Sequence, residues 1–391
     1  MPSGTSVAEA PIRDRRRDEF PALARGIHLL SHSLGPVPRA AHESVRTYLE
    51  RWENQIAEEP WSTSWWDLPT EVGDRIARIL GAPPGSVQVQ PNTSVALSVV
   101  ASCFDFASGS RRKVVTGGLD FPTTGYIWEA QRSLGADVTV IPSQDGLTLP
   151  LEPILGAIDE RTAMVALSHV SYRSSHRLDP RPIIERAHEV GALVLLDVYQ
   201  SAGILEIDAA GWEVDFLVGG TIKWLCGGPA CGYLYVRPDL ARGLQPRLTG
   251  WFAHADPFEF ESGATRYAAG ARRFAQGTPP IPALAVCLPG LAILSEAGLP
   301  AIAAESRRRT RRIIEFALER GWRVNSPLRD EARGGCVMIG VPQPGATVER
   351  LRARRVLCDW RPGVGLRLSA HFFNSDEEIL EALEILAGIL A

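Results

Sequence analysis

Two stretches decide the fold of this chain: Leu193-Val-Leu-Leu-Asp-Val-Tyr-Gln200 and Asp215-Phe-Leu-Val-Gly-Gly-Thr-Ile-Lys-Trp-Leu-Cys-Gly-Gly-Pro229. Each begins with an apolar run of the length of a buried strand. The first run delivers the carboxylate of Asp197, and the second delivers the amine of Lys223, 26 residues further along the chain. That separation accommodates a crossover and the next parallel strand. We therefore expect both side chains at neighbouring strand ends of an α/β sheet.

A buried amine beside a buried carboxylate indicates pyridoxal phosphate chemistry. The amine forms an imine with the cofactor aldehyde, and the acid keeps the ring nitrogen protonated. Lys223 is flanked by Ile222 and Trp224, where a solvated lysine has no obvious place. Burial lowers the pKa of a lysine and favours the neutral amine that attacks an aldehyde. Each residue alone has an ordinary alternative, since most lysines are solvated and most strand-end aspartates act as caps.

The composition is that of a globular enzyme. The chain has 391 residues, of which 45% are hydrophobic and 22% charged, with a net charge of −4. A charge this close to neutral removes the general electrostatic argument for nucleic-acid or membrane partners. Basic clusters occur at Arg13 to Arg17 and at Arg307 to Arg312; the second has helical spacing and is interpreted as a solvated face, with anion binding as the alternative.

No metal site and no export signal are expected. The six cysteines form no metal-binding pattern, and Cys226 with Cys231 has no nearby histidine. Reduced thiols are the simplest account of them. The N-terminus lacks an apolar core of signal-peptide length, and no apolar run reaches the length of a membrane span. We expect a cytoplasmic protein.

Helix-like stretches alternate with short β-rich runs, which is typical of an α/β domain. The candidate strands, which form one large and mostly parallel sheet, are Val87 to Gln90, Lys113 to Thr116, Val138 to Ile141, Ala163 to Leu167, Leu193 to Leu196, Phe216 to Val218 and Gly232 to Val236. Helices are expected between them at Asp67 to Leu80, Ser94 to Phe104, Gly125 to Leu134 and Pro182 to Val190. Ligands bind outside the carboxyl ends of the strands in such sheets.

Three segments are expected: an N-terminal segment 1–40, a large cofactor-binding domain 41–282 and a smaller α/β domain 283–391. The character of the chain changes after Gly277-Thr-Pro-Pro-Ile-Pro282, where a long helical stretch runs from about Ala283 to Gly321. The last helix, Ser375 to Leu390, begins with a serine N-cap and an acidic first turn.

Residues at other strand ends extend the expected site. Asn92, Thr93 and Ser94 follow the first strand and precede a helix whose free amides and hydroxyls suit a phosphate. An ordinary helix cap is the alternative. Phe121 follows the second strand, where it could stack on a cofactor ring or simply fill the core.

Motifs spread over nearly the whole chain resemble those of bacterial kynureninases. They are Arg51-Trp, Trp66-Asp-Leu-Pro, Gly73-Asp-Arg-Ile-Ala, Phe121-Pro-Thr, His169-Val-Ser-Tyr-Arg, Thr249-Gly-Trp-Phe-Ala-His and Arg273-Phe-Ala-Gln-Gly-Thr-Pro-Pro-Ile. The resemblance implies a fold-type I pyridoxal phosphate enzyme, normally a homodimer with active sites shared at the subunit interface. It also implies that Lys223 forms the internal aldimine, Asp197 pairs with the pyridinium nitrogen and Phe121 stacks on the ring. Thr93, Ser94 and Thr221 would contact the phosphate.

The same resemblance assigns contacts beyond the strand ends. Trp251 and Thr278 match residues that the family brings into the site from the partner subunit. Arg367 matches the arginine that grips the α-carboxylate of the substrate, and a guanidinium fork suits a carboxylate well. A surface strand residue is the alternative for Arg367.

Some positions depart from the kynureninase pattern. Gln200 and Ile222 stand where kynureninases carry a histidine and a tyrosine, and Thr124 stands where they usually carry an aspartate. The Asp-x-x-Gln arrangement resembles the wider class V group of cysteine desulfurases and isopenicillin N epimerase-like proteins, in which the glutamine contacts the phenolic oxygen of the ring. A desulfurase needs a mobile catalytic cysteine, for which Cys336 and Cys358 are the candidates in the small domain; packing is favoured for Cys336.

The leading functional prediction is kynureninase-type hydrolytic cleavage of the Cβ–Cγ bond in a kynurenine-like γ-keto amino acid. After Lys223 is released, it would remove the α-proton to give a quinonoid. The alternatives are a class V aminotransferase, a cysteine desulfurase-like C–S lyase, or a catalytically idle binding protein of this fold. Trp61, Trp65 and Trp66 could line an aromatic substrate pocket or anchor their loop on the dimer partner.

Overall fold

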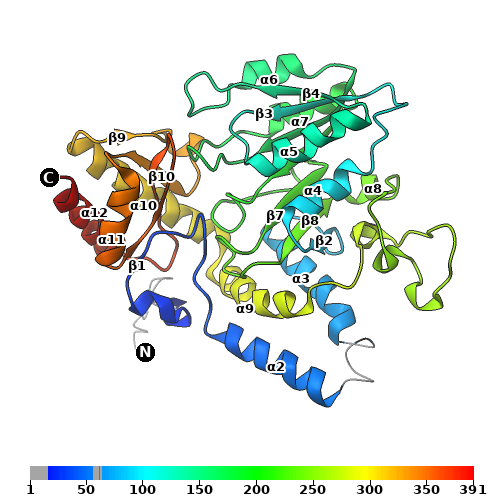
Figure 1. Ribbon diagram of the computed structural model, residues 1–391, viewed down its shortest axis with the longest axis horizontal. Helices are drawn as coiled ribbons and strands as arrows, with labels where there is room; N and C mark the ends of the chain where they lie inside the picture. The colour runs from blue at the N-terminus through cyan, green and yellow to red at the C-terminus, as the bar shows by residue number, and fades with distance from the viewer. Residues whose placement is uncertain (1–15, 56–60, 62–63) are drawn as a thin grey trace, which may run out of the picture.

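The structure is a computed structural model that describes residues 16–55, 61 and 64–391 (Figure 1). Most of the expected N-terminal segment is therefore described, but its first 15 residues are not. The beginning of the basic cluster at Arg13 lies outside the described residues. Residues 56–60 and 62–63, on either side of Trp61, lie outside them as well.

A seven-stranded sheet of order β2-β8-β7-β6-β5-β3-β4 forms the centre of the large domain. Its strands are β2 (Val87–Gln90), β3 (Lys113–Gly117), β4 (Asp137–Ile141), β5 (Thr162–Ser168), β6 (Leu193–Asp197), β7 (Phe216–Gly220) and β8 (Gly232–Val236). β8 runs antiparallel to β2 and β7, and the other neighbours are parallel. The expected mostly parallel sheet is confirmed.

Alternate residues of the central strands enter two different cores, one on each face of the sheet. Val194 and Leu196 of β6 belong to one core, whereas Leu195 between them belongs to the other. Because both faces of the sheet are covered, the residues that point to either face are apolar. The strands are therefore continuous apolar runs in the sequence. The covering helices are α3 (Trp65–Ile79), α4 (Thr93–Ala101), α5 (Pro122–Ala130), α6 (Leu151–Ala157), α7 (Arg181–Glu189) and α8 (Pro238–Ala241).

The small domain has its own sheet, of order β12-β13-β10-β9, and its own core. The strands are β9 (Arg323–Val324), β10 (Cys336–Gly340), β12 (Asp359–Arg361) and β13 (Gly365–Ser369), with β1 (Ile27–His28) paired to β11 (Val356–Leu357) nearby. Helices α11 (Pro344–Ala353) and α12 (Asp376–Leu390) lie on this side of the molecule (Figure 1). The predicted N-cap is confirmed, since Ser375 and Glu378 form a reciprocal capping box.

The expected single helical stretch from Ala283 to Gly321 is two helices. α9 (Ile281–Ala297) and α10 (Leu299–Glu319) meet at an angle of 83°. Gly298 between them has a φ of 85°, a conformation that favours glycine, and so the chain turns there. α9 packs against α2 (Ala40–Asn54) and α3, and its buried side chains join a core of the large domain. The domain boundary at residue 282 stays a prediction. Most of α9 follows this boundary in the sequence, but the helix packs against the large domain.

Within the part of the chain that the structure describes, no single helix is long and apolar enough to cross a membrane. α9 and α10 meet that criterion only as a bent pair, by length and composition alone.

Candidate active site

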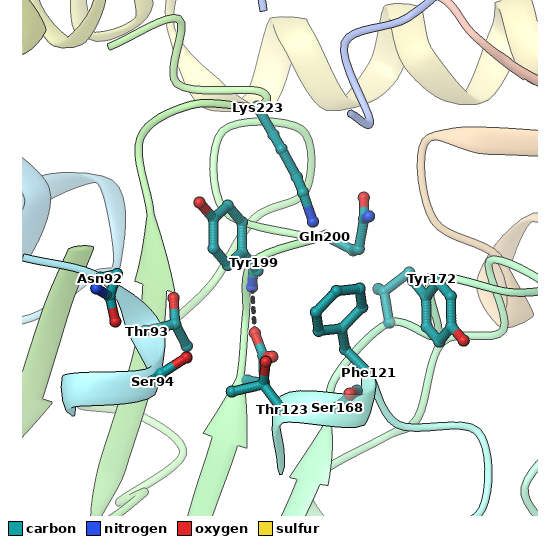
Figure 2. Close-up of a pocket in the computed structure, with 12 residues that line it drawn as sticks. Asn92, Thr93, Ser94, Phe121, Thr123, Ser168, Tyr172, Tyr199, Gln200 and Lys223 are labelled. Atoms are coloured by element: carbon teal, nitrogen blue, oxygen red, sulfur yellow. Dashed lines mark hydrogen bonds between the residues drawn. The ribbon is translucent and has the colours of Figure 1, made fainter. Parts of the chain in front are cut away.

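The carboxyl ends of the parallel strands meet at a cavity of about 250 Å³ (Figure 2). Its walls come from the residues that end or follow β2, β3, β5, β6 and β7, namely Asn92, Thr93, Ser94, Phe121, Thr123, Ser168, Val170, Tyr172, Asp197, Tyr199, Gln200 and Lys223. Six residues that the sequence predicted for the site are thus brought together: Thr93, Ser94, Phe121, Asp197, Gln200 and Lys223. Adjacent parallel strands explain this gathering, because their carboxyl ends share one edge of the sheet.

Lys223 offers an amine without a partner. It makes no hydrogen bond or ion pair with any other described residue. Loss of hydration lowers its pKa to about 8, although the carboxylate of Asp197 acts in the opposite direction. Its Nζ atom lies 5.8 Å from the ring centroid of Phe121 and 4.1 Å from that of Tyr199. Lys223 is one of only two lysines in the sequence, and the other, Lys113, pairs with Asp159.

Two buried carboxyl groups lie near each other at the strand ends around the cavity. Asp197 accepts a hydrogen bond of 2.8 Å from the backbone N–H of Tyr199, and burial raises its pKa despite that bond and the nearby Lys223. Asp120 accepts from the backbone N–H groups of Gly117, at 2.8 Å, and Ser168, at 2.7 Å. Burial raises the pKa of Asp120 to about 6. Asp120 therefore ties the end of β3 to the end of β5 and fixes the position of Phe121, its neighbour in the chain.

The N-terminus of α4 leaves donors for an anion. Asn92 caps the helix by accepting from the backbone N–H of Val95 at 3.0 Å. The hydroxyl of Ser94 makes no hydrogen bond with another described residue. Gly232 lies directly beneath, since a Cβ there would come within 2.6 Å of the Asn92 carbonyl carbon. The free amides of Thr93 and Ser94 and the Ser94 hydroxyl fit a phosphate group.

Two residues that were predicted to contact the cofactor, Gln200 and Thr221, form hydrogen bonds within the chain. The side-chain amide of Gln200 donates to the carbonyl of His32 at 3.0 Å and accepts from the indole of Trp224 at 3.2 Å. A contact from Gln200 to a ring oxygen would use the second hydrogen of its Nε2 atom. Thr221 does not line the cavity; its buried hydroxyl donates to the carbonyl of Gly228 at 2.9 Å. This geometry gives the predicted phosphate contact of Thr221 no support.

Arg367 lies on β13 and does not line the cavity, and its guanidinium is held by an aspartate. Its Nε and Nη2 atoms donate to the two carboxylate oxygens of Asp359 at 2.8 and 2.6 Å, and its Nη1 donates to the carbonyl of Tyr172 at 3.2 Å. Although burial acts in the opposite direction, the hydrogen bonds from His32 and Arg367 hold the pKa of Asp359 well below its ordinary value. Arg367 is 2% exposed. A carboxylate ligand would have to approach its remaining edge.

His32 completes this network. Burial lowers its pKa to about 4, so the ring is neutral at pH 7. Its Nε2 lies 2.8 Å from Asp359 and its Nδ1 lies 2.8 Å from the hydroxyl of Ser369. Since the carboxylate can only accept, Nε2 carries the proton and Nδ1 accepts from Ser369. Three residues further on, the backbone N–H of Gly35 donates to the carbonyl of Ile222, beside Lys223.

Trp251 and Thr278 lie outside the cavity of their own chain. Trp251 packs edge-on against Phe252, with ring centroids 4.5 Å apart, and also contacts Trp61. Thr278 is exposed. Their predicted role requires a partner subunit and stays a prediction. Trp61, Trp65 and Trp66 do not line this cavity either, and their predicted roles stay predictions.

Sequence reasoning missed several residues of the site. Tyr199, Tyr172, Ser168 and Thr123 line the cavity, and Asp120, His32 and Asp359 position residues around it. Tyr199 and Asp120 carried a signal, because each is close in sequence to a predicted site residue. Asp359 carried none, since only the β12–β13 register brings it opposite Arg367.

Among residues 16–55, 61 and 64–391, no group of three or more His, Cys, Asp or Glu side chains could hold a metal ion.

The sequence matches the aminotransferase class-V family over residues 27–344. It is 31% identical over 380 residues to the uncharacterized aminotransferase YcbU of Bacillus subtilis (strain 168), with 96% of this chain and 98% of that protein covered. It is 32% identical over 392 residues to a kynureninase of Pseudomonas fluorescens, with 96% of this chain and 91% of that protein covered.

The fold is similar to that of solved structures. An apo cysteine desulfurase from Thermococcus onnurineus NA1 superposes with a TM-score of 0.86, covering 98% of this chain and 99% of that one at 21% identity. At this level of identity the likeness concerns the fold alone.

The lowered pKa of Lys223 gives a first prediction. The neutral amine is the nucleophile, and its share rises as the pH passes through a pKa of about 8. In cofactor-free protein, imine formation with pyridoxal phosphate should therefore rise between about pH 6 and 8 and level off above about pH 9. Borohydride trapping followed by peptide mass spectrometry measures it. Asp197→Asn removes a charge that raises this pKa, and so the levelling should move to lower pH.

Lys113→Arg is the matched control and should leave this profile unchanged. A trapping rate that still climbs tenfold per pH unit above about pH 9, as for an ordinary lysine, would contradict the prediction.

Proposed function

The chain belongs to the class-V aminotransferase family, and from that premise we propose that it hydrolyses the Cβ–Cγ bond of a kynurenine-like γ-keto amino acid. Pyridoxal phosphate is the cofactor of this family. The observation that carries the proposal is the unpaired amine of Lys223, held between two aromatic rings and above the buried carboxyl group of Asp197.

The cavity residues fit the cofactor. When bound, pyridoxal phosphate supplies an aldehyde for amines and a ring that takes up the electron pair of a broken bond. Asp197 would hold the proton of the ring nitrogen, and Phe121 would cover one face of the ring. The amides at the start of α4 and the hydroxyl of Ser94 would hold the phosphate. Lys223 would anchor the group covalently and then move the proton at the α-carbon of the substrate.

Arg367 is the proposed partner of the substrate carboxylate. A guanidinium has five N–H groups. Asp359 accepts a hydrogen bond from the N–H of Nε and from one N–H of Nη2, and the carbonyl of Tyr172 accepts one from an N–H of Nη1. One hydrogen on Nη1 and one on Nη2 are left. This supports the binding of a single carboxylate to a cation that the chain already holds in place.

The cysteines bear on the choice of reaction. A desulfurase needs a thiolate, but both small-domain candidates are buried. Burial raises the pKa of the Cys336 thiol well above its ordinary value and that of Cys358 to about 12. These observations favour kynureninase-type cleavage over sulfur extraction by an enzyme cysteine. An aminotransferase or a C–S lyase without a catalytic cysteine is the second candidate, supported by the likeness to YcbU. All six cysteines are free, which is compatible with the cytoplasmic location that we propose.

The substrate is predicted to release alanine. Purified protein with pyridoxal phosphate should convert kynurenine, 3-hydroxykynurenine or a related γ-keto amino acid to alanine, detected by mass spectrometry. Lys223→Ala should abolish the product. The proposal is wrong if none of these amino acids gives alanine while the wild-type protein binds the cofactor. A keto acid product would then indicate an aminotransferase, and sulfide from cysteine or cystine would indicate a C–S lyase.

Replacement of Arg367 should affect substrate binding more than turnover. Arg367→Lys removes the planar fork, so the KM for an amino acid should rise about 10- to 100-fold while cofactor affinity stays the same. Steady-state kinetics and cofactor titration measure the two effects. Arg361→Gln is the control, because this side chain also pairs with Asp359, at 3.2 Å, but is 40% exposed. An unchanged KM in Arg367→Lys would remove Arg367 from the substrate site.

We also propose a homodimer. Four exposed aromatic rings contact one another in series: Trp61, Trp251, Phe258 and Phe260. Their exposed fractions are 37%, 37%, 50% and 77%. A second copy of the chain that covers these rings would account for them and would bring Trp251 and Thr278 towards its cavity. Sedimentation velocity of the cofactor-loaded protein should give twice the mass of one chain. A monomer at micromolar concentration would contradict this.

A further inference from the structure

Tyr199 lines the cavity beside Lys223, and the proposed function assigns it no contact with the cofactor. Its ring lies under the Nζ atom of Lys223, 4.1 Å from centroid to nitrogen, and Phe121 lies 5.8 Å from the same atom. The two ring centroids are therefore at most about 10 Å apart. A flat ring between two aromatic walls needs about 7 Å, because stacked carbon atoms lie roughly 3.5 Å from one another. This upper limit leaves room for at most one aromatic ring stacked between Tyr199 and Phe121.

The backbone fixes Tyr199 in this position. Its N–H donates to the carboxylate of Asp197, so the residue is tied to the acid at the floor of the cavity. Its hydroxyl lies against Gly220 at the end of β7, where a Cβ atom would come within 2.5 Å of the hydroxyl oxygen. Phe121, in contrast, is held by an edge-on contact with Tyr172, with centroids 5.2 Å apart. The two rings are thus positioned by different strands.

The hydroxyl of Tyr199 faces the start of α4. Gly220 is paired with Gly232 in the β7–β8 register, and Gly232 packs directly beneath Asn92 and Thr93. The hydroxyl lying on Gly220 is consequently on the same side as the free amides of the helix. Figure 2 shows the Tyr199 oxygen directed away from Phe121, on the side of Asn92 and Thr93.

The hydroxyl is also chemically available. It makes no hydrogen bond with another described residue. Burial, followed by the charge of Asp197, raises its pKa well above the ordinary value for tyrosine, so the group stays a phenol that can donate to an anion. A side chain that only filled space would not need this oxygen, and phenylalanine would serve.

We propose that Tyr199 is a cofactor-binding residue, whose ring closes the slot opposite Phe121 and whose hydroxyl donates to the phosphate held at the N-terminus of α4. The proposal rests on the binding of pyridoxal phosphate and not on the reaction that follows. One side chain would thus contact both the ring and the phosphate of the cofactor. The ring and the hydroxyl can be separated by substitution.

The test uses two variants and two ligands. Affinities for pyridoxal phosphate and for pyridoxal, which lacks the phosphate, are measured by quenching of protein fluorescence. Tyr199→Phe keeps the ring, so it should bind pyridoxal phosphate about tenfold more weakly and pyridoxal as the wild type does. Tyr199→Leu loses the ring as well and should weaken both ligands by about tenfold or more. Tyr126→Phe, 74% exposed on α5, is the control and should change neither.

Each outcome decides the proposal. If Tyr199→Phe binds pyridoxal phosphate as tightly as the wild type, or loses pyridoxal equally, the phosphate contact is wrong. If Tyr199→Leu binds pyridoxal as tightly as the wild type, the ring is not a wall of the slot. Circular dichroism confirms that each variant is folded. Wild-type protein that binds the cofactor but forms no alanine would defeat the proposed reaction and leave this inference standing.

Discussion

The desolvated amine of Lys223 above the carboxyl group of Asp197 is the arrangement on which the site depends, and the sheet produces it. β6 and β7 are adjacent and parallel, with Asp197 opposite Val218 in their register. The chain leaves β7 at Gly220, and three residues later Lys223 lines the same cavity as Asp197. Neither group could be held in this way on a surface loop, where hydration would restore the ordinary pKa of each.

The small domain reaches this arrangement through the segment that contains His32 and Gly35. His32 binds Asp359 through its ring and accepts from Gln200 through its carbonyl, so one residue contacts both domains. Gly35 packs so closely on the Lys223 segment that a Cβ atom would lie 2.2 Å from the lysine carbonyl oxygen. The position of Arg367 is therefore coupled to that of Lys223 by a short path of hydrogen bonds and backbone contacts.

The sequence predicted the parts of this site that depend on strand ends. Burial on both faces of the sheet makes β6 and β7 recognisable in the sequence as continuous apolar runs, and the polar residues that follow such runs are expected at one edge of the sheet. It did not predict contacts that depend on long-range register. Asp359 meets Arg367 only because β12 and β13 pair antiparallel, and Tyr199 faces α4 only because Gly220 is opposite Gly232. The break between α9 and α10 was readable from Gly298, but apolar periodicity continued across it.

The scarcity of lysine has a practical consequence. An aldehyde reacts with any neutral amine, and most proteins of this size offer it many surface lysines. Here arginine supplies nearly all of the positive charge, and the second lysine is engaged with Asp159 at 3.2 Å. Guanidinium groups do not form imines under mild conditions because they stay protonated. Carbonyl reagents at modest excess should thus label one lysine almost exclusively among the side chains, which makes this chain suited to carrying a single side-chain reporter group in its own active site.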